Sequence, residues 1–158
     1  MPTPAYCYIN EGDPEGSVEI AGREGSIEVI NFDHNVHIPV DIHSGRASGV
    51  RTHKPAVITK AYDKSSPYLA KALCNGETFD TVKVMWYEID DLGDEVNYFT
   101  HLFEKVRVSD IRSFSPNAKD PEMEHFTHME EISFVYQRVT WTFEDGALTY
   151  TDDWVAER

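Results

Sequence analysis

Two long stretches of the chain alternate apolar and polar residues, and each changes the phase of that alternation once. Residues 26–40 place apolar side chains on one face up to Val29 and on the opposite face from Ile30 onward. Residues 129–144 behave in the same way, with the change at Gln137–Arg138. Because each face of a strand keeps one side-chain phase, a phase change indicates a bulge or bend. Long, bent strands are typical of a sheet that curls toward a barrel, so the pattern favours a mainly β fold of that kind.

Shorter runs of the same kind predict further strands, and clusters of Gly, Pro, Asn and Asp separate them. The predicted strands are Ala5–Ile9, Ser17–Ile20, Ser26–Val40, Ala56–Tyr62, Asp80–Ile89, Val96–Phe103, Val106–Phe114, Met129–Glu144 and Ala147–Thr151. Asp145-Gly146 is a hairpin signal between the last two of them. Several strands carry apolar residues on both faces, which favours cover by another subunit.

A single helix is predicted at residues 66–75. Ser66 is the expected N-cap, Pro67 takes the first helical position and Gly76 ends the helix. Its apolar stripe consists of Leu69, Ala72 and Leu73. Because this stripe is narrow, the helix requires a sheet surface to pack against.

The formal net charge of −14 argues against nucleic acid and anionic membrane surfaces as partners, because both require a dominating basic surface. No run approaches the roughly 18 apolar residues of a membrane span, so no membrane insertion is expected. The opening residues MPTPAYCYIN lack the cationic and apolar regions of a signal peptide, which favours cytoplasmic synthesis. Cys7 and Cys74 form neither a disulfide framework nor a zinc spacing, and both are expected to be reduced and packed.

The distribution of charge along the chain is uneven. Residues 46–71 contain six of the 14 cations with Asp63 as their one acid, whereas residues 10–33 contain seven acids against Arg23, and residues 88–95 contain five acids. Opposite patches on one chain suit a head-to-tail contact, which closes into a ring or propagates as a stack. Charge alone is equally compatible with patches that are accidents of a solvated surface.

Catalytic and metal-binding patterns are not found. His34 and His37 are three apart on a predicted strand and so face opposite sides, and no zinc spacing appears. The acidic turn 90–95 lacks the ligand order of a calcium loop. Nucleophile elbows, phosphate loops and dinucleotide fingerprints are absent. We therefore predict no enzyme, no cofactor and no metal, with a monomeric β-barrel ligand-binding module and a metal-dependent hydrolase as the open alternatives.

Several motifs occur in a specific order along the whole chain. They are Met1-Pro2-Thr3-Pro4-Ala5-Tyr6, Phe32-Asp33-His34, Gly49-Val50-Arg51-Thr52-His53-Lys54-Pro55, Asp63-Lys64-Ser65-Ser66-Pro67, Trp86-Tyr87, Lys119-Asp120-Pro121, His128-Met129-Glu130-Glu131 and the region from Trp141 to Trp154. Together they resemble the haemolysin-coregulated protein (Hcp) family, the tube proteins of bacterial type VI secretion systems. Residues 10–14 and 114–117 depart somewhat from the family pattern.

The resemblance implies a β-barrel of two antiparallel sheets with a flanking helix at 66–75, forming one domain over residues 1–158 without a fused effector domain. It implies a homo-hexameric ring, and rings that stack head to tail into a tube. A contractile sheath drives such a tube out of the cell behind a spike protein, with baseplate components and effector proteins as further partners. Family members are secreted without a classical signal peptide, and the family offers no catalytic residues to carry over.

The extended loop at residues 41–52 is the predicted contact surface. It exceeds the roughly two to five residues of a hairpin connection, and long ordered loops are often functional. Gly45 and Gly49 permit its turns, and Arg46, Arg51 and Lys54 supply a charge complement to an acidic neighbour. The candidate residues for contacts between subunits or rings are Asp41, His43, Ser44, Gly45, Arg46, Gly49, Arg51, His53, Lys54, Asp152, Asp153 and Trp154.

Overall fold

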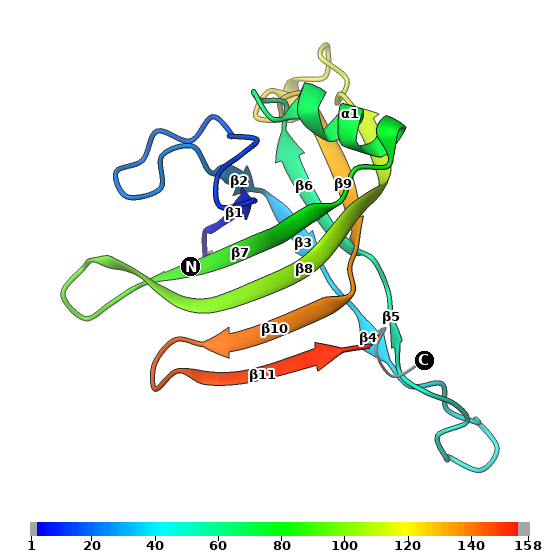
Figure 1. Ribbon diagram of the computed structural model, residues 1–158. Coiled ribbons are helices and arrows are strands. Elements are labelled where there is room, and N and C mark those ends of the chain that lie inside the picture. Colours follow the sequence, from blue (N-terminus) through cyan, green and yellow to red (C-terminus); the bar gives the residue numbers. More distant parts are fainter. Residues whose placement is uncertain (1–2, 155–158) are drawn as a thin grey trace.

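The computed structural model describes residues 3–154, and strands dominate its regular structure (Figure 1). The elements in chain order are β1 Ala5–Ile9, β2 Ile27–Val29, β3 Asn31–Asp33, β4 Val36–His37, β5 Thr52–His53, β6 Ala56–Ala61, α1 Ser66–Asn75, β7 Phe79–Ile89, β8 Glu95–Phe114, the 3-10 helix η1 Pro121–Met123, β9 Met129–Val135, β10 Arg138–Phe143 and β11 Leu148–Asp153. Within the described residues, no helix has the length and apolar character needed to cross a membrane.

Two antiparallel sheets share the long strand β8. One sheet contains β2, β1, β7, β8, β10 and β11, and the other contains β8, β9, β6 and β3. The path of paired strands starts at β2 and ends at β3, and these two strands are consecutive in the chain. Between them, the Ile30 N–H donates to the Thr59 carbonyl of β6 at 2.8 Å. The predicted fold class, mainly β with two antiparallel sheets and one helix, is confirmed.

Both predicted phase changes mark breaks between strands. Ile30 separates β2 from β3, and residues 136–137 separate β9 from β10. The two long strands expected at 26–40 and 129–144 are therefore wrong as single elements. In each case the two halves pair in different sheets. β2 pairs with β1 and β3 with β6, whereas β9 pairs with the second half of β8 and β10 with the first half.

The strand β8 itself was expected as two strands, Val96–Phe103 and Val106–Phe114, and this division is wrong. Lys105 has a positive φ of 54° and lets the strand bend without a turn. A single bent strand can therefore belong to both sheets. The sequence did not indicate this bend, because it has no Gly or Pro there.

The strand predicted at Ser17–Ile20 is also wrong. This segment lies against residues 25–26 through single hydrogen bonds, from Gly16 N–H to the Gly25 carbonyl and from Val18 N–H to the Ser26 carbonyl. A Cβ at position 16 would lie 2.2 Å from the Ser26 carbonyl oxygen. The close approach of the two backbones thus requires glycine at that position.

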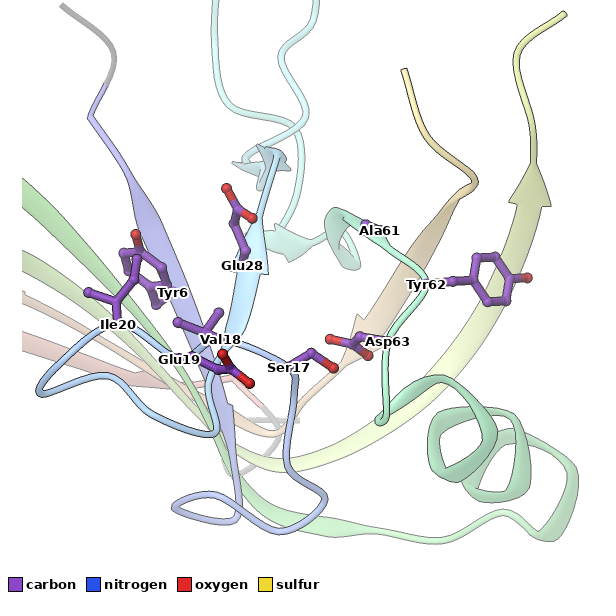
Figure 2. Close-up of a pocket in the computed structure, with 9 residues that line it drawn as sticks. All are labelled: Tyr6, Ser17, Val18, Glu19, Ile20, Glu28, Ala61, Tyr62 and Asp63. Carbon is purple, nitrogen blue, oxygen red and sulfur yellow. The ribbon is translucent and has the colours of Figure 1, made fainter. Parts of the chain in front are cut away.

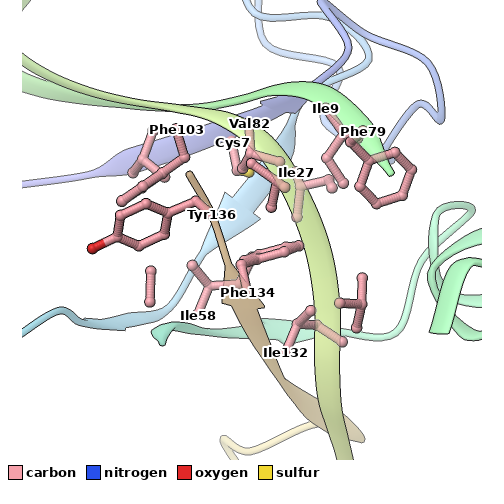
Figure 3. Close-up of a cluster of buried hydrophobic side chains, with 14 of the residues drawn as sticks. Cys7, Ile9, Ile27, Ile58, Phe79, Val82, Phe103, Ile132, Phe134 and Tyr136 are labelled. Carbon is pink, nitrogen blue, oxygen red and sulfur yellow. The ribbon is translucent and has the colours of Figure 1, made fainter. Parts of the chain in front are cut away.

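The apolar core fills the space between the two sheets (Figure 3). Its fully buried members include Cys7, Ile9, Ile27, Ile58, Leu69, Val82, Phe103, Ile132 and Phe134. Burial raises the pKa of the Cys7 thiol to about 12, so this cysteine behaves as an apolar side chain. Cys74 is exposed, and the prediction that it is packed is wrong, because it lies on the helix face opposite Leu69.

The helix α1 packs on β8, and Leu69 and Ala72 are buried as predicted. Its N-cap position is Ser65 rather than Ser66, because the Asp63 carboxylate accepts the Ser65 N–H at 2.9 Å and starts the turn one residue earlier. Gly76 ends the helix with a φ of 65°, a left-handed conformation that favours glycine.

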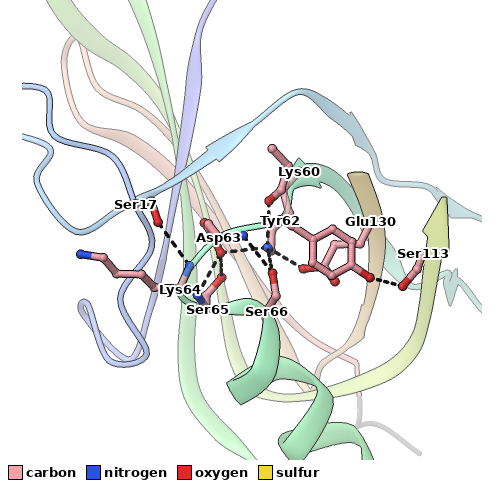
Figure 4. Close-up of polar contacts among 10 residues, drawn as sticks. Ser17, Lys60, Tyr62, Asp63, Lys64, Ser65, Ser66, Ser113 and Glu130 are labelled. Carbon is pink, nitrogen blue, oxygen red and sulfur yellow. Dashed lines mark hydrogen bonds and ion pairs between the residues drawn. The ribbon is translucent and has the colours of Figure 1, made fainter. Parts of the chain in front are cut away.

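A buried ionic cluster lies beneath the start of α1 (Figure 4). The Lys60 ammonium is fully buried and lies 2.5 Å from Glu130 Oε1 and 3.0 Å from Asp63 Oδ1. It also donates a hydrogen bond to the Ser66 hydroxyl at 3.0 Å. The Glu130 contact is an ion pair without hydrogen-bond alignment, so its attraction is mainly Coulombic. Lys60 is therefore no part of a cationic surface, which corrects the view of residues 46–71 as one charged patch.

Candidate assembly surface

Residues 38–51 project from the barrel as an arm between β4 and β5 (Figure 1). Every residue from 35 to 50 is exposed. Hydrogen bonds from Asp41 N–H to the Arg46 carbonyl and from Ser48 N–H to the Pro39 carbonyl, both 2.8 Å, hold the two sides of the arm together. The arm carries four exposed apolar side chains, Ile38, Val40, Ile42 and Val50. A structured, apolar and solvated extension is typical of a contact surface.

The tip of the arm is ordered by Asp41. Its carboxylate accepts the His43 N–H and the Ser44 hydroxyl, both at 2.9 Å, and its carbonyl accepts the Gly45 N–H at 2.8 Å. These hydrogen bonds lower the pKa of the Asp41 carboxyl, with the bond from the His43 backbone as the main cause. Gly45 has a φ of 69°, a left-handed backbone conformation that glycine adopts readily, so it permits the turn as predicted.

The base of the arm is anchored on the C-terminal strand. Arg51 donates two hydrogen bonds to the Asp152 carboxylate, at 2.6 and 2.7 Å, in a bidentate pair. His53 Nε2 lies 2.7 Å from the same carboxylate, and the His53 ring stacks on Trp154 at 5.2 Å. The Arg51 hydrogen bonds hold the pKa of the Asp152 carboxyl below its usual value, so it stays charged at neutral pH.

A chain of hydrogen bonds continues from this anchor into the barrel. The Tyr136 hydroxyl lies 2.7 Å from His53 Nδ1 and 2.5 Å from His34 Nε2. The ionised Asp152 carboxylate can only accept, so His53 donates its Nε2–H to it. Burial raises the pKa of the Tyr136 hydroxyl, which therefore keeps its proton. The arm is thus connected to the core through His53 and Tyr136.

His34 and His101 lie together in an aromatic cluster behind this chain, with ring centroids 6.0 Å apart. Burial lowers the pKa of each imidazole to about 4, and the neighbouring His53 adds to the effect on His34. His101 Nδ1 accepts the Trp86 Nε1–H at 3.1 Å, so its neutral form is hydrogen-bonded. Both rings are therefore uncharged across the neutral range.

We expect the free energy of unfolding to fall as the pH is lowered from about 6.5 to about 4. Because the folded-state pKa values of His34 and His101 lie below the unfolded value, the unfolded chain binds protons first. Urea denaturation at a series of pH values measures this slope. The variant His101→Gln, whose amide oxygen can still accept from Trp86, should show a shallower slope, and an unchanged slope would contradict the assignment.

The structure divides the candidate residues into two groups. Asp41, His43, Ser44, Gly45, Arg46 and Gly49 lie on the arm, whereas Arg51, His53, Lys54, Asp152, Asp153 and Trp154 lie at or near its base. Arg51 pairs with Asp152 of its own chain, and the Asp153 carboxylate oxygen Oδ2 lies 3.4 Å from Nη2 of Arg138. Their contacts with other subunits stay a prediction.

Sequence reasoning missed the residues that complete this surface. Tyr136 and His34 were not candidates, because nothing local links Tyr136 to His53, 83 positions earlier, or to His34, 102 positions earlier. The arm's apolar side chains were overlooked because the loop showed no apolar period. The sequence feature that could have indicated them is the presence of Ile42 and Val50 among Ser, Gly and charged residues.

A shallow hollow of about 310 Å³ lies between residues 17–20 and the strands β2 and β6 (Figure 2). The Tyr62 ring points away from the apolar side chains at its other end, and its three carboxylates, Glu19, Glu28 and Asp63, point in different directions. Across residues 3–154, no group of three or more His, Cys, Asp or Glu is placed to hold a metal ion.

Comparison with known proteins gives a consistent result. The family model described as "Type VI secretion system effector, Hcp" matches residues 8–143. The chain is 39% identical to the "Major exported protein" of Pseudomonas aeruginosa over 166 positions, which cover 98% of this chain and 96% of that protein. Among solved structures it is similar to Hcp1 from E. coli EAEC 042, with 36% identity, a TM-score of 0.83 and coverage of 98% and 99%. The secreted protein Hcp3 from Pseudomonas aeruginosa is 33% identical, with a TM-score of 0.77 and coverage of 97% and 99%.

Proposed function

Because this chain belongs to the Hcp family of type VI secretion system proteins, we propose that it is a structural subunit of the tube which that system exports. Six copies close a ring, and rings stack head to tail into a tube. A contractile sheath drives the tube outward behind a spike protein, from a baseplate, and small effectors travel in its lumen. The subunit is made in the cytoplasm and secreted by the system itself, and its role is assembly rather than catalysis.

The arm is the observation that carries this proposal. Its four apolar side chains are solvated in the single subunit, and full burial of an isoleucine or valine side chain contributes about 1.5–3 kcal/mol. Ile42 and Val50 are 89% and 82% exposed, so almost all of that contribution is available to a partner. The anchor of Arg51 on Asp152 holds the arm in place before contact, which reduces the ordering cost of association.

Rings and short stacks are expected in electron micrographs of the purified chain, and the stacks should lengthen as salt is added. Each copy carries a net charge of −14, and this repulsion is screened within about 10 Å at 0.1 M salt, whereas apolar burial is not weakened. Sedimentation velocity at low and high salt measures the change in particle size. The formation of rings should depend less on salt concentration than the stacking of rings does, because each ring is a single closed particle. A monomer at every protein and salt concentration would overturn the proposed function.

A further inference from the structure

The Tyr136 hydroxyl lies between two histidine rings. Its oxygen points away from the apolar side chains of the core (Figure 3), and within residues 3–154 its hydrogen-bond partners are His53 Nδ1 at 2.7 Å and His34 Nε2 at 2.5 Å. Tyr136 is 5% exposed, so water does not replace these partners. A buried hydroxyl must both give its proton to an acceptor and satisfy its oxygen, and the two rings divide these roles.

One proton of His53 is fixed by its surroundings. The Asp152 carboxylate lies 2.7 Å from His53 Nε2 and accepts two hydrogen bonds from Arg51. Because an ionised carboxylate can only accept, Nε2 of His53 is protonated in both charge states of the ring. The charge of His53 is therefore decided at Nδ1, the atom that faces Tyr136.

The two charge states of His53 require opposite directions in the hydrogen bonds of Tyr136. A neutral His53 accepts the Tyr136 proton at Nδ1, and the Tyr136 oxygen then accepts Nε2–H of His34. A cationic His53 instead donates Nδ1–H to the Tyr136 oxygen. The hydroxyl proton must then turn to His34, since a buried proton donor without an acceptor is destabilising. His34 accepts it only as the tautomer that carries its proton on Nδ1.

The access of water to the two rings differs. The side chain of His53 has no exposed surface, and its Nδ1 faces the Tyr136 hydroxyl. His34 is only partly buried. A proton can therefore enter at His34 Nδ1 and be relayed, as Nε2–H of His34 passes to Tyr136 and O–H of Tyr136 passes to His53. One proton is taken from water, two bonds to hydrogen break and three form, and the positive charge ends on His53.

The charged and titratable groups around His53 favour a positive charge on this ring. They are Arg51 and Lys54 beside it in the chain, His37 on the paired strand β4, and Asp152 and Asp153 on β11. Of these, the Asp152 carboxylate is in contact with the ring, and it stabilises a cation there. Asp153 contacts Arg138 instead.

The groups around His34 oppose a charge on that ring. Burial is the main cause that lowers the pKa of His34 to about 4, His53 adds to the effect, and Asp33 acts against it. The neighbouring His101, 6.0 Å away between ring centroids, is itself neutral in this range. A proton that enters at His34 therefore changes its tautomer and does not leave it charged.

We propose that His34, Tyr136 and His53 form a proton relay and switch, in which charging of the buried His53 reverses the Tyr136 hydroxyl and changes the tautomer of His34. In the charged state, Asp152 lies between two cations, Arg51 and His53, and the junction of β5 with β11 is held more tightly. In the neutral state, Arg51 remains as its cation. The relay makes this junction sensitive to pH through a ring that solvent does not touch.

Magic-angle-spinning NMR of protein labelled with ¹⁵N-histidine tests the switch in whatever assembly state the protein adopts. The ¹⁵N shifts distinguish a protonated ring nitrogen from a bare one, and spectra of His34→Gln and His53→Gln assign the two rings. Between pH of about 8 and about 5, where histidine changes charge, His53 should gain a proton on Nδ1. His34 should change tautomer at the same midpoint and stay neutral.

Three variants show whether Tyr136 carries the coupling. Tyr136→Phe removes only the hydroxyl and keeps the ring against Phe103, so His34 should then keep one tautomer throughout. His53→Gln, which cannot be charged, should have the same effect on His34. Tyr150→Phe is the matched control on the exposed strand β11, and it should leave both transitions as in the parent.

The parent protein alone can overturn the switch. A His34 tautomer that stays constant while His53 charges, or that changes at a separate midpoint, excludes the relay, and so does a His53 that keeps one charge over the whole range. A His34 transition that persists in Tyr136→Phe excludes Tyr136 as the link. Each of these results leaves the proposed function standing, because the test reads protons and not assembly.

Discussion

A chain carrying Ile42→Glu and Val50→Glu is expected to fold and to form no stacks at any salt concentration. Both side chains are almost fully exposed, at 89% and 82%, so the fold should lose no more than about 0.5 kcal/mol. In a contact with another subunit, each new carboxylate would be desolvated without a partner, at a cost of at least about 2 kcal/mol. Two such costs lower the association constant about a thousandfold.

Sedimentation velocity and electron microscopy measure this loss, and thermal unfolding checks the fold. Tyr68→Glu is the matched control, because Tyr68 is 58% exposed but lies on α1, away from the arm. It should leave assembly close to that of the parent. Stacks of unchanged length in the double variant would show that the arm is not an assembly surface.

The largest effect on stability is expected from Lys60→Met. The ammonium of Lys60 is fully buried beside Glu130, which is 2% exposed, so its removal leaves a buried carboxylate without its cation. Breaking a buried pair in this way costs about 3–5 kcal/mol. The double variant Lys60→Met with Glu130→Leu removes both charges and should recover most of that loss, since Asp63 keeps its hydrogen bonds to Ser65.

Urea denaturation in the Ile42→Glu, Val50→Glu background measures these free energies without interference from stacking. The neighbouring residue on β9 provides the control, because Glu131 pairs with Arg112 at 3.2 Å on the exposed side of the same strand. Arg112→Met should cost no more than about 1 kcal/mol, as exposed pairs do. A loss at Lys60 as small as that at Arg112 would contradict the cluster's structural role.

Local patterns allowed much of the fold to be predicted. The helix 66–75 was predicted with its correct bounds, because Pro67, the apolar stripe and Gly76 act within a few residues of one another. The phase changes near Ile30 and Gln137 were found because a bend must shift the side-chain pattern wherever it occurs. The same reasoning failed at Ser17–Ile20, because this segment makes single hydrogen bonds to residues 25–26 and, among the described residues, forms no ladder with a strand.

The candidate surface was predicted less completely. The loop and its glycine turn were identified from composition, and Asp41 to Arg46 do lie on the arm. The role of Arg51 as an anchor could not be found, because its partner Asp152 is 101 residues away along the chain. Charge counting likewise placed Lys60 with the surface cations, although it is fully buried.

By itself, the sequence determined the class of fold, the helix, the turns and the family, because each depends on residues close together or on motifs in a set order. Only the tertiary structure decided which charges are buried, which apolar side chains remain in solvent and what holds the arm. Burial and pairing are set by contacts between strands that the sheets bring together, as β6 and β9 bring Lys60 to Glu130. The exposure of Ile42 is also decided by the tertiary structure, since among residues 3–154 no strand lies beside the tip of the arm to cover it.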